Sequence, residues 1–253
     1  MKRLSDLTRS FPERPPSDDI HDLRVAARRV QAMVRVLPKG IRKSKRAKRF
    51  RNALESLLKS TSEVRDMDTL IETLGIEKGS LPAEVLRSLE NERSDLAATT
   101  RRSILAFARA KAPPMDPSKI SPKKLARRLR NQEGKQFQVM SALLPEVTGD
   151  ESKVKELHTL RKEVKKLRYV KELGDGLSSE LEILIQWQEA LGAVHDLDVA
   201  VDYLKAGRWR IPESVLEDLR HKRHSRYVHF LGIVLGGHQR IFSVSAMLPK
   251  SAR

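Results

Sequence analysis

The sequence contains no cysteine, which excludes disulfide bonds, a thiol nucleophile and a thiolate metal site. Aromatic residues form only 4% of the 253 residues, too few to provide a platform on which nucleic-acid bases would stack. The N-terminus has no apolar segment of the kind that a secretory signal requires, and the longest nearly apolar run, 227–237, is too short to span a bilayer. We therefore expect a cytoplasmic protein without a membrane partner.

Motifs that mark nucleotide, metal or nucleophile chemistry are also absent from the sequence. The chain has no Gly-x-x-x-x-Gly-Lys-Ser/Thr, Gly-x-Gly-x-x-Gly, His-Glu-x-x-His or Gly-x-Ser-x-Gly segment. These absences favour a protein that is not an enzyme and that needs no cofactor.

Positive charge is what the chain has in excess. Fifty Lys and Arg residues against 33 Asp and Glu residues give a formal net charge of +17 and an isoelectric point near 10.3. Hydrophobic residues, at 39%, are sufficient for a folded core. A charge imbalance of this size predicts a polyanionic partner.

The hydrophobic pattern is helical throughout the chain. Proline and glycine fall mostly between periodic segments, and hardly any stretch alternates as a half-buried strand does. We therefore expect an all-α protein. The predicted helices cover 17–37, 42–74, 82–111, 122–144, 152–173, 179–205 and 212–247.

Two signatures occur twice in the same order. The first, His-x-x-Arg-x-x-x-(Arg/Lys)-(Arg/Lys), begins at His21 and again at His158. The second, Val-x-Asp-x-Asp, begins at Val64 and again at Val194. This duplication predicts two helical bundles of the four-helix type, related by a pseudo-twofold axis.

The repeat also sets the expected domain organisation. We expect a short N-terminal segment at 1–16, a first bundle at 17–112, a linker at 113–121 and a second bundle at 122–253. Because Pro12, Pro15 and Pro16 interrupt the N-terminal segment, the first bundle is expected to lack part of its first helix.

The first repeated helix has an apolar face and a basic face. The apolar stripe consists of Leu23, Ala27, Val30, Val34 and Leu37. The basic face consists of His21, Arg24, Arg28 and Arg35. From His21 to Arg51 the chain has twelve Lys or Arg residues and a single acid, Asp22, so neighbouring carboxylates do not relieve the repulsion. Such a face costs stability unless an anion neutralises it.

The second repeated helix has the same two faces. Its apolar stripe is Leu160, Val164 and Leu167, and its basic face is His158, Arg161, Lys165 and Tyr169 with Arg168 on the flank. Two further basic stripes are Arg42, Lys45, Arg46 and Arg49 in the first half, and Lys123, Lys124, Arg127, Arg128 and Arg130 in the second. A single charge run is usually a solvated face, but its recurrence on a duplicated helix favours anion binding.

Arginine, which dominates the first stripe, can donate two parallel hydrogen bonds to phosphate oxygens and keeps its charge at any working pH. The charge states of His21 and His158 near pH 7 are open, so each is either a phosphate donor or a structural anchor.

The Asp-x-Asp pairs, Asp66/Asp68 and Asp196/Asp198, suggest a metal site at first sight. Two residues two positions apart on a helix point in different directions, so they form a poor chelate. We expect these carboxylates to pair with arginines of the adjacent helix, and we predict no metal site.

Taken together, the duplicated histidine helices, the Lys-Leu-Arg-Tyr run at 166–169 and the Leu-Gly-x-x-His-Asp-Leu-Asp segment at 191–198 resemble the CHAD domain, the conserved-histidine α-helical domain. The resemblance extends over about 18–247, so that 17–253 would form one such domain. It implies two four-helix bundles about a pseudo-dyad, a basic central groove or pore, and binding of inorganic polyphosphate.

The resemblance also implies phosphate contacts. These are His21, Arg24, Arg28 and Arg35 with His158, Arg161, Lys165 and Arg168, flanked by Arg42, Lys45, Arg46, Arg49, Lys124, Arg127 and Arg128. One departure is that Arg65 stands where the second repeat has His195, so the two halves need not contribute equally.

Our leading hypothesis is a non-catalytic module that holds linear polyphosphate by charge-assisted hydrogen bonds, in the cytoplasm and in association with polyphosphate granules. Other polyanions, including acidic proteins and nucleotides, are alternative occupants. A nucleic-acid-binding helical protein is the second hypothesis, which the net charge favours and the scarcity of aromatics weakens. A phosphoanhydride hydrolase is the third, and it lacks an acidic metal cluster and a nucleophile.

Overall fold

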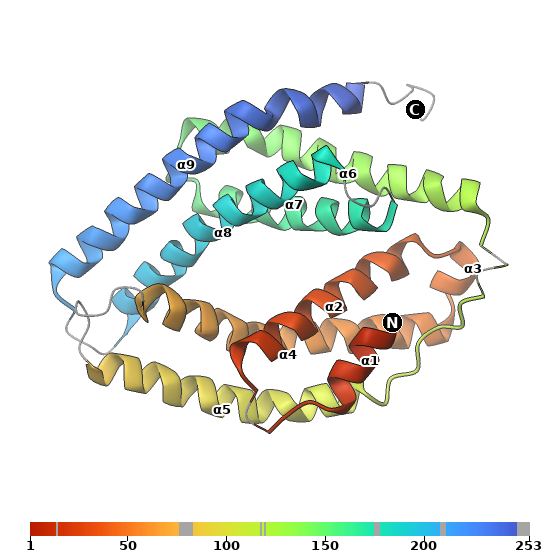
Figure 1. Ribbon diagram of the computed structural model, residues 1–253, viewed down its shortest axis with the longest axis horizontal. Coiled ribbons are helices and arrows are strands. Elements are labelled where there is room, and N and C mark those ends of the chain that lie inside the picture. Colours follow the sequence, from red (N-terminus) through yellow and green to blue (C-terminus); the bar gives the residue numbers. More distant parts are fainter. Residues whose placement is uncertain are drawn as a thin grey trace. The chain divides into compact units, whose positions relative to one another are not determined.

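A computed structural model describes residues 1–13, 15–75, 83–116, 118, 120–174, 178–207 and 211–246. These residues form nine α-helices and no strand, which confirms the predicted all-α class (Figure 1). The chain divides into two compact units, Met1–Leu125 and Ala126–Arg253, here called the first and second units. Each unit has a hydrophobic core of its own.

The first unit is built on the predicted apolar stripe. It contains α1 (Lys2–Arg9), α2 (Ser17–Val36), α3 (Lys39–Arg42), α4 (Lys45–Gly75) and α5 (Ala83–Phe107). Helix α2 packs against α1 and α4, and α4 packs against α5. The predicted stripe residues Leu23, Ala27, Val30, Val34 and Leu37 are all buried in this core, as predicted.

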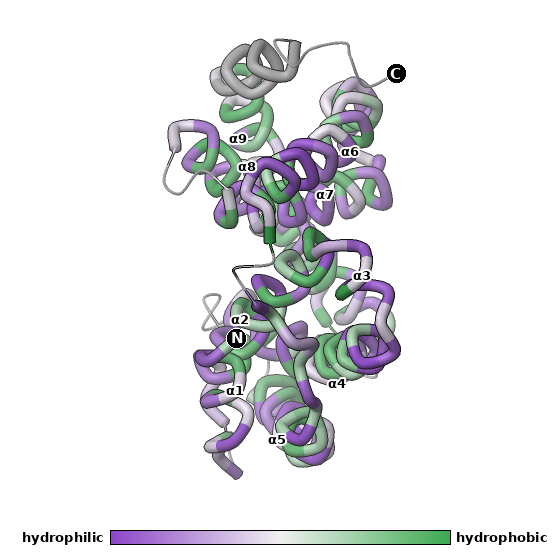
Figure 2. The backbone as a smooth tube through the Cα atoms, turned by 90° about the vertical axis from the view of Figure 1, so that its right-hand side faces the viewer, coloured by the Kyte–Doolittle hydropathy of each residue, from purple (hydrophilic) through white to green (hydrophobic). Residues whose placement is uncertain are grey.

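The second unit contains α7 (Val154–Gly174), α8 (Ser179–Ala206), α9 (Glu213–Ala246) and all but the first turn of α6 (Pro122–Gly149). Helix α8 packs against both α7 and α9. The predicted stripe residues Leu160, Val164 and Leu167 are buried here with Trp187 and Phe230. Figure 2 shows hydrophobic and hydrophilic positions alternating along the helices, as expected for elements with one buried face.

Helix α1 lies in the segment for which the sequence predicted only a short N-terminal stretch. Its Leu4 is 2% exposed, and Phe11, just after the helix, is 5% exposed; both belong to the core of the first unit. Helix α1 has 8 residues, whereas α6, the helix that precedes α7, has 28. The first unit therefore begins with a short helix.

The predicted helix at 42–74 begins three residues later than expected, because Arg42 ends α3 and a new helix begins at Lys45. Ser44 separates the two, and its hydroxyl oxygen accepts a hydrogen bond from the Ala47 backbone N–H at 3.1 Å, which caps α4. The Arg42 guanidinium turns back and donates to the Arg35 carbonyl at 3.0 Å. Arg42 is thus not part of one helical stripe with Lys45.

The predicted end of the fourth helix at Leu144 is wrong, because α6 continues through Pro145 to Gly149. A proline inside a helix removes one backbone hydrogen bond. The tertiary packing compensates, since Val147 is fully buried and its carbonyl accepts a hydrogen bond from the Tyr227 hydroxyl at 2.7 Å. The other predicted helices agree with the structure to within four residues at the ends that are described. The predicted helix ends at Pro82 and Met247, and residues 117 and 119 of the predicted linker, lie outside the described residues.

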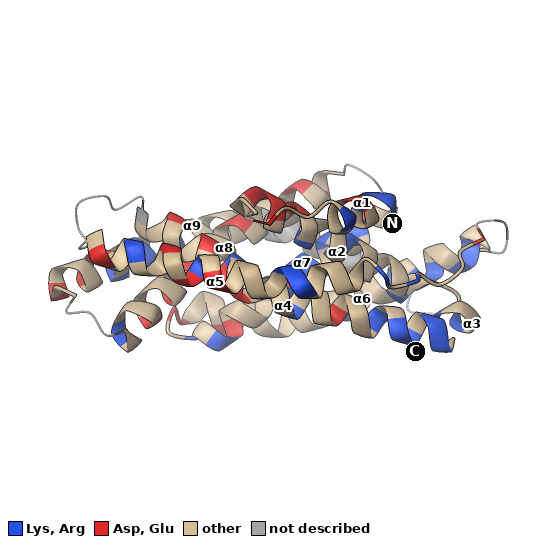
Figure 3. Cartoon of the chain, turned by 90° about the horizontal axis from the view of Figure 1, so that it is seen from below, with Lys and Arg blue, Asp and Glu red and all other residues tan. Residues whose placement is uncertain are grey.

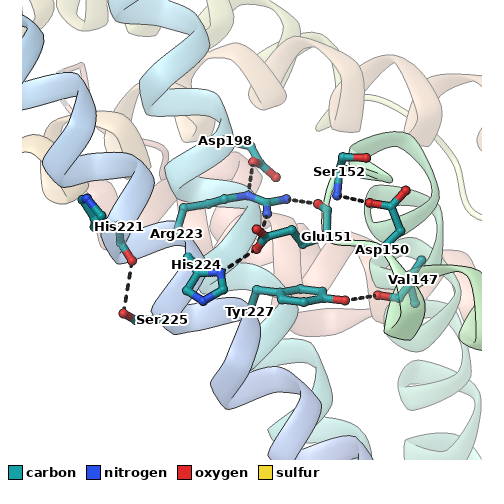
Figure 4. Close-up of polar contacts among 10 residues, drawn as sticks. All are labelled: Val147, Asp150, Glu151, Ser152, Asp198, His221, Arg223, His224, Ser225 and Tyr227. Atoms are coloured by element: carbon teal, nitrogen blue, oxygen red, sulfur yellow. Dashed lines mark hydrogen bonds and ion pairs between the residues drawn. The ribbon is translucent and has the colours of Figure 1, made fainter.

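One arginine–aspartate pair recurs in both units. In the first unit, Arg93 Nε donates to Asp68 Oδ1 at 2.6 Å, and its Nη2 donates to the Pro15 carbonyl at 2.8 Å. In the second unit, Arg223 Nε donates to Asp198 Oδ1 at 2.8 Å, and its Nη2 donates to the Glu151 carbonyl at 2.7 Å (Figure 4).

These contacts confirm that Asp68 and Asp198 pair with arginines of the adjacent helix. Burial raises the pKa of Asp198, although the hydrogen bond and the charge of Arg223 act in the opposite direction. The two side chains of the second pair are only 13% and 14% exposed, so both charges are largely shielded from water.

We expect Arg223→Ala to lower the free energy of unfolding by about 3 kcal/mol, because Asp198 would stay buried without its partner. Urea unfolding at neutral pH measures the loss. The control is Arg220→Ala on the same helix, where the ion pair with Glu213 is 45% and 63% exposed and its loss should cost at most about 1 kcal/mol. Equal losses in the two variants would contradict a role for the buried pair.

Candidate anion-binding site

The second unit brings histidines and cations of two helices together. His158, Arg161 and Lys165 are three and four residues apart on α7, so they share one helix face, and all three are half-buried. The His195 imidazole of α8 lies against that of His158, with 4.5 Å between the ring centroids. Asp196 is the acid of this group, with its Oδ1 3.8 Å from Arg161 Nη2. These five residues are called the α7–α8 cluster below.

The guanidinium of Arg161 is placed over α8. Besides its contact with Asp196, its Nε lies beside Gly192, where an added Cβ would come within 3.9 Å of it. A methyl group there would be in ordinary van der Waals contact with the guanidinium, so Arg161 lies close to the α8 backbone without requiring a glycine at this position. Both α8 residues belong to the Leu-Gly-x-x-His-Asp segment that carries the family resemblance.

The electrostatics of the cluster decide the charge of its histidines. Burial, reinforced by the charge of Arg161, lowers the pKa of His195 to about 3. Burial and the charges of Lys162 and Arg161 also lower the pKa of His158 from its ordinary value of 6.5. Both imidazoles are thus neutral at pH 7 in the free protein. The His158 Nδ1 is buried and has no hydrogen-bond partner among the described residues.

The first unit differs at the corresponding positions. His21, in the first turns of α2, is exposed, and Arg65 of α4 occupies the sequence position that His195 has in the other repeat. Arg24 is half-buried and its Nη1 donates to the Leu58 carbonyl at 2.8 Å and to Thr61 Oγ1 at 2.9 Å. Arg24 therefore ties α2 to α4.

Most of the remaining predicted residues of the first unit are exposed. Arg28 is exposed and donates to Gln31 Oε1 at 3.1 Å, and Arg35 is half-buried. Lys45, Arg46 and Arg49 are exposed on the first two turns of α4. Figure 3 shows Lys and Arg on α2, on α3 and near the start of α6.

On the basic helix α6, Lys124 and Arg127 are exposed and Arg128 is half-buried. The Arg128 Nη1 is buried and lacks a hydrogen-bond partner among the described residues. Guanidinium donors left unpaired in this way favour an acceptor-rich ligand.

Tyr169 does not lie on the open basic face as predicted, because it is 9% exposed. The Arg168 guanidinium lies 4.6 Å from the centroid of the Tyr169 ring, and its Nε is 3.5 Å from Glu172 Oε1. An aromatic ring gains more free energy from burial than from exposure beside cations, which explains the difference. Arg168 therefore already has two partners within α7.

Sequence reasoning did not identify the arginines that hold Asp68 and Asp198, nor the contact between His158 and His195. A signal for the arginines was present. The pattern Val-Leu-x-x-Leu-x-x-x-Arg ends at Arg93 and again at Arg223, at the same interval along the chain as the two Asp-x-Asp segments. No comparable repeat marked the histidine contact, because Arg65 occupies the position in the first repeat that His195 has in the second.

Two negative findings apply to the described part of the chain. It contains no group of three or more His, Asp or Glu residues placed to hold a metal ion. None of its helices combines the length and the apolar character needed to cross a membrane.

Comparison with known proteins agrees with this fold. The family model described as CHAD domain matches residues 2–205, and the chain belongs to this family. The chain is also similar to the crystal structure of the CHAD domain from the plant Ricinus communis, with a TM-score of 0.63 and 16% identity over 94% of this chain and 87% of that chain. No curated protein matches the chain.

The lowered pKa of His195 predicts how stability changes with pH. His195 binds a proton near pH 6.5 in the unfolded chain but only near pH 3 in the folded chain. The contribution of neutral His195 to the free energy of unfolding is therefore fully present well above pH 6.5, and it is lost as the pH falls toward 3. We expect His195→Gln to reduce this fall by about 1 kcal/mol per pH unit between pH 6.5 and 5, measured by urea unfolding. The control His229→Gln, on an exposed position of α9, should leave the wild-type slope. An unchanged slope in His195→Gln would contradict the buried neutral histidine.

Proposed function

We propose that this protein is a non-catalytic module that binds linear inorganic polyphosphate. The observation that carries the proposal is the α7–α8 cluster, in which half-buried Arg161 and Lys165 are held beside two neutral histidines with one acid among them. Membership of the CHAD family supports the same ligand class. The shared groove and the pseudo-twofold arrangement that the family resemblance implies are part of this proposal.

Polyphosphate matches the chemistry of these helices. It carries a negative charge at every unit and has no bases to stack, and the chain is poor in aromatic residues. Guanidinium groups donate two hydrogen bonds to phosphate oxygens, and a released counterion accompanies each phosphate that is neutralised. Binding should therefore weaken steeply as salt increases.

The proposed contacts have two kinds of task. Arg24 and Arg161 are held by α4 and by Asp196, so they present guanidinium groups with little loss of side-chain entropy. Exposed cations such as Arg28, Arg46 and Arg49 attract the chain and add contacts at higher entropic cost. His21 and His158 are proposed to donate to phosphate once protonated.

The first test removes exposed charge from the proposed faces. We expect the triple variant Arg28→Gln, Arg46→Gln, Arg49→Gln to bind long polyphosphate about tenfold more weakly at low salt, because three phosphate contacts are lost. The slope of log affinity against log salt should fall by about 2, at roughly 0.7 for each contact. Fluorescence anisotropy with labelled polyphosphate at several salt concentrations measures both quantities.

The matched control is Arg87→Gln, Arg102→Gln, Arg109→Gln, three exposed arginines on or just after α5 with the same change in net charge. The control should keep affinity within about twofold, since only long-range attraction changes. Equal weakening in both triples would show that binding follows net charge alone.

In competition at equal phosphate concentration, polyphosphate should displace RNA and duplex DNA. The reverse order would favour a nucleic-acid-binding protein, which the net charge of +17 also permits.

The second test uses pH. A bound phosphate chain favours the charged form of a nearby imidazole, so the pKa of a histidine that is neutral in the free protein rises on binding. We expect His158 to take up this proton, because His195 is shifted to about 3 and remains neutral. Affinity for long polyphosphate should therefore increase as the pH falls from 8 to 6, and calorimetry in buffers of different ionisation enthalpy should detect proton uptake.

His158→Gln should bind with a clearly smaller pH dependence over this range and with less proton uptake than the wild type, and what remains belongs to His21. Lys153→Gln, a control that removes an exposed charge just before α7, should keep both. Wild-type affinity that is constant from pH 8 to 6 would exclude His158 as a phosphate donor.

A further inference from the structure

The first unit contains a pocket whose charge is opposite to that of the basic helices. It has a volume of about 570 Å³ and lies between the start of α2, the second half of α4 and α5. Its charged lining consists of Asp18, Asp68, Glu72 and Glu90 with Arg65 and Arg93, beside His21. Four carboxylates and two guanidinium groups give this lining an excess of negative charge.

Asp68 is a buried charged residue of the pocket lining. The Asp68 side chain is 3% exposed, and its Oδ1 accepts the Arg93 hydrogen bond. Its Oδ2 is buried and has no hydrogen-bond partner among the described residues. A buried carboxylate oxygen without a donor is costly, so the pocket favours a ligand that brings an N–H group.

In the second unit, the corresponding arginine has an acceptor for each of its three side-chain nitrogens. All three nitrogen positions of Arg223 are occupied there, because Nη1 donates to the Glu151 carboxylate at 3.3 Å in addition to the two contacts described above (Figure 4). The corresponding Arg93 uses Nε on Asp68 and Nη2 on the Pro15 carbonyl, and no described residue accepts from its Nη1. Among the described residues, no carboxylate therefore takes the place at Arg93 that Glu151 has at Arg223, and the pocket lies beside Arg93.

The acids of the pocket have basic counterparts in the second unit. When the two histidine helices are aligned on their shared signature, Asp18 corresponds to Lys155. When the two Asp-x-Asp segments are aligned, Glu90 corresponds to Arg220. The duplicated scaffold therefore carries opposite charges at these two positions. A ligand of the pocket needs at least one cationic group for the acids that the two arginines do not neutralise.

We propose that this pocket binds an amino acid with a cationic side chain, such as lysine or arginine, with its carboxylate on Arg93 and its ammonium or guanidinium donors on Asp68, Glu72 and Glu90. The ligand carries one negative and two positive groups, which matches both the open arginine position and the excess of acids. The pocket volume is within the range of about 300–1,000 Å³ that small-molecule sites occupy. The inference does not depend on polyphosphate binding.

The test is calorimetric titration of the full-length chain with L-lysine and with L-arginine. Two probes separate the parts of the ligand: cadaverine is lysine without its carboxylate, and L-norleucine is lysine without its side-chain amine. At least one of the two amino acids should bind saturably at one site. Each probe should bind about tenfold or more weakly, since a charged contact worth about 1.4 kcal/mol is lost.

Variants locate the site. Glu72→Gln and Glu90→Gln are exposed positions of the pocket, so they should fold normally and weaken lysine binding about tenfold. Glu55→Gln, an exposed acid of α4 outside the pocket lining, should leave lysine binding unchanged. Polyphosphate affinity, measured on the same variants, should not fall, so failure of one proposal is visible separately from failure of the other.

Three results would overturn the inference. They are the absence of saturable binding of both amino acids, binding of cadaverine or norleucine as tight as that of lysine, and an equal loss in Glu55→Gln and Glu72→Gln. Tight cadaverine binding would identify a simple amine site in place of an amino-acid site.

Discussion

The buried arginine–aspartate pair fixes where each basic helix begins. Arg93 reaches from α5 to Asp68 of α4 and to the carbonyl of Pro15, two residues before α2. Arg223 reaches from α9 to Asp198 of α8 and to the carbonyl of Glu151, three residues before α7. One guanidinium therefore joins a helix pair to the start of the helix that carries the histidine and the arginine row. The placement of His21 and His158 depends on this contact in each unit.

The half-buried positive charges of the α7–α8 cluster lower the stability of the folded free protein. Arg161 and Lys165 are half-buried, and with burial itself they keep His158 and His195 neutral at pH 7. Asp196 offsets part of this charge, at 3.8 Å from Arg161. A site that is strained by repulsion in the free protein gains more free energy from an anion than a neutralised surface would, because the anion removes the repulsion as it binds.

Periodicity predicted the parts of the fold that depend on one helix alone. The apolar stripes of α2 and α7 are buried as expected, because the spacing of residues such as Val30 and Val164 fixes one face of a helix. The two departures have different causes. The Ser44 hydroxyl caps α4 through a local contact and divides it from α3, whereas a tertiary contact from Tyr227 supports α6 beyond Pro145. For the candidate site, the sequence predicted that Asp198 pairs with an arginine, but which arginine depends on the packing of α9 against α8.

The two units show how a duplicated scaffold can acquire separate chemistry. The pair that holds the helices is retained in both, with Nε–Oδ1 distances of 2.6 Å in Arg93–Asp68 and 2.8 Å in Arg223–Asp198. The residues around the pair differ. The first unit has Arg65 where the second has His195, and Glu90 where the second has Arg220. Charges at exposed positions of a helix change at little cost in stability, whereas a buried ion pair does not tolerate the loss of one partner. The same arginine–aspartate pair can therefore support a basic helix face in the second unit and an acidic pocket in the first.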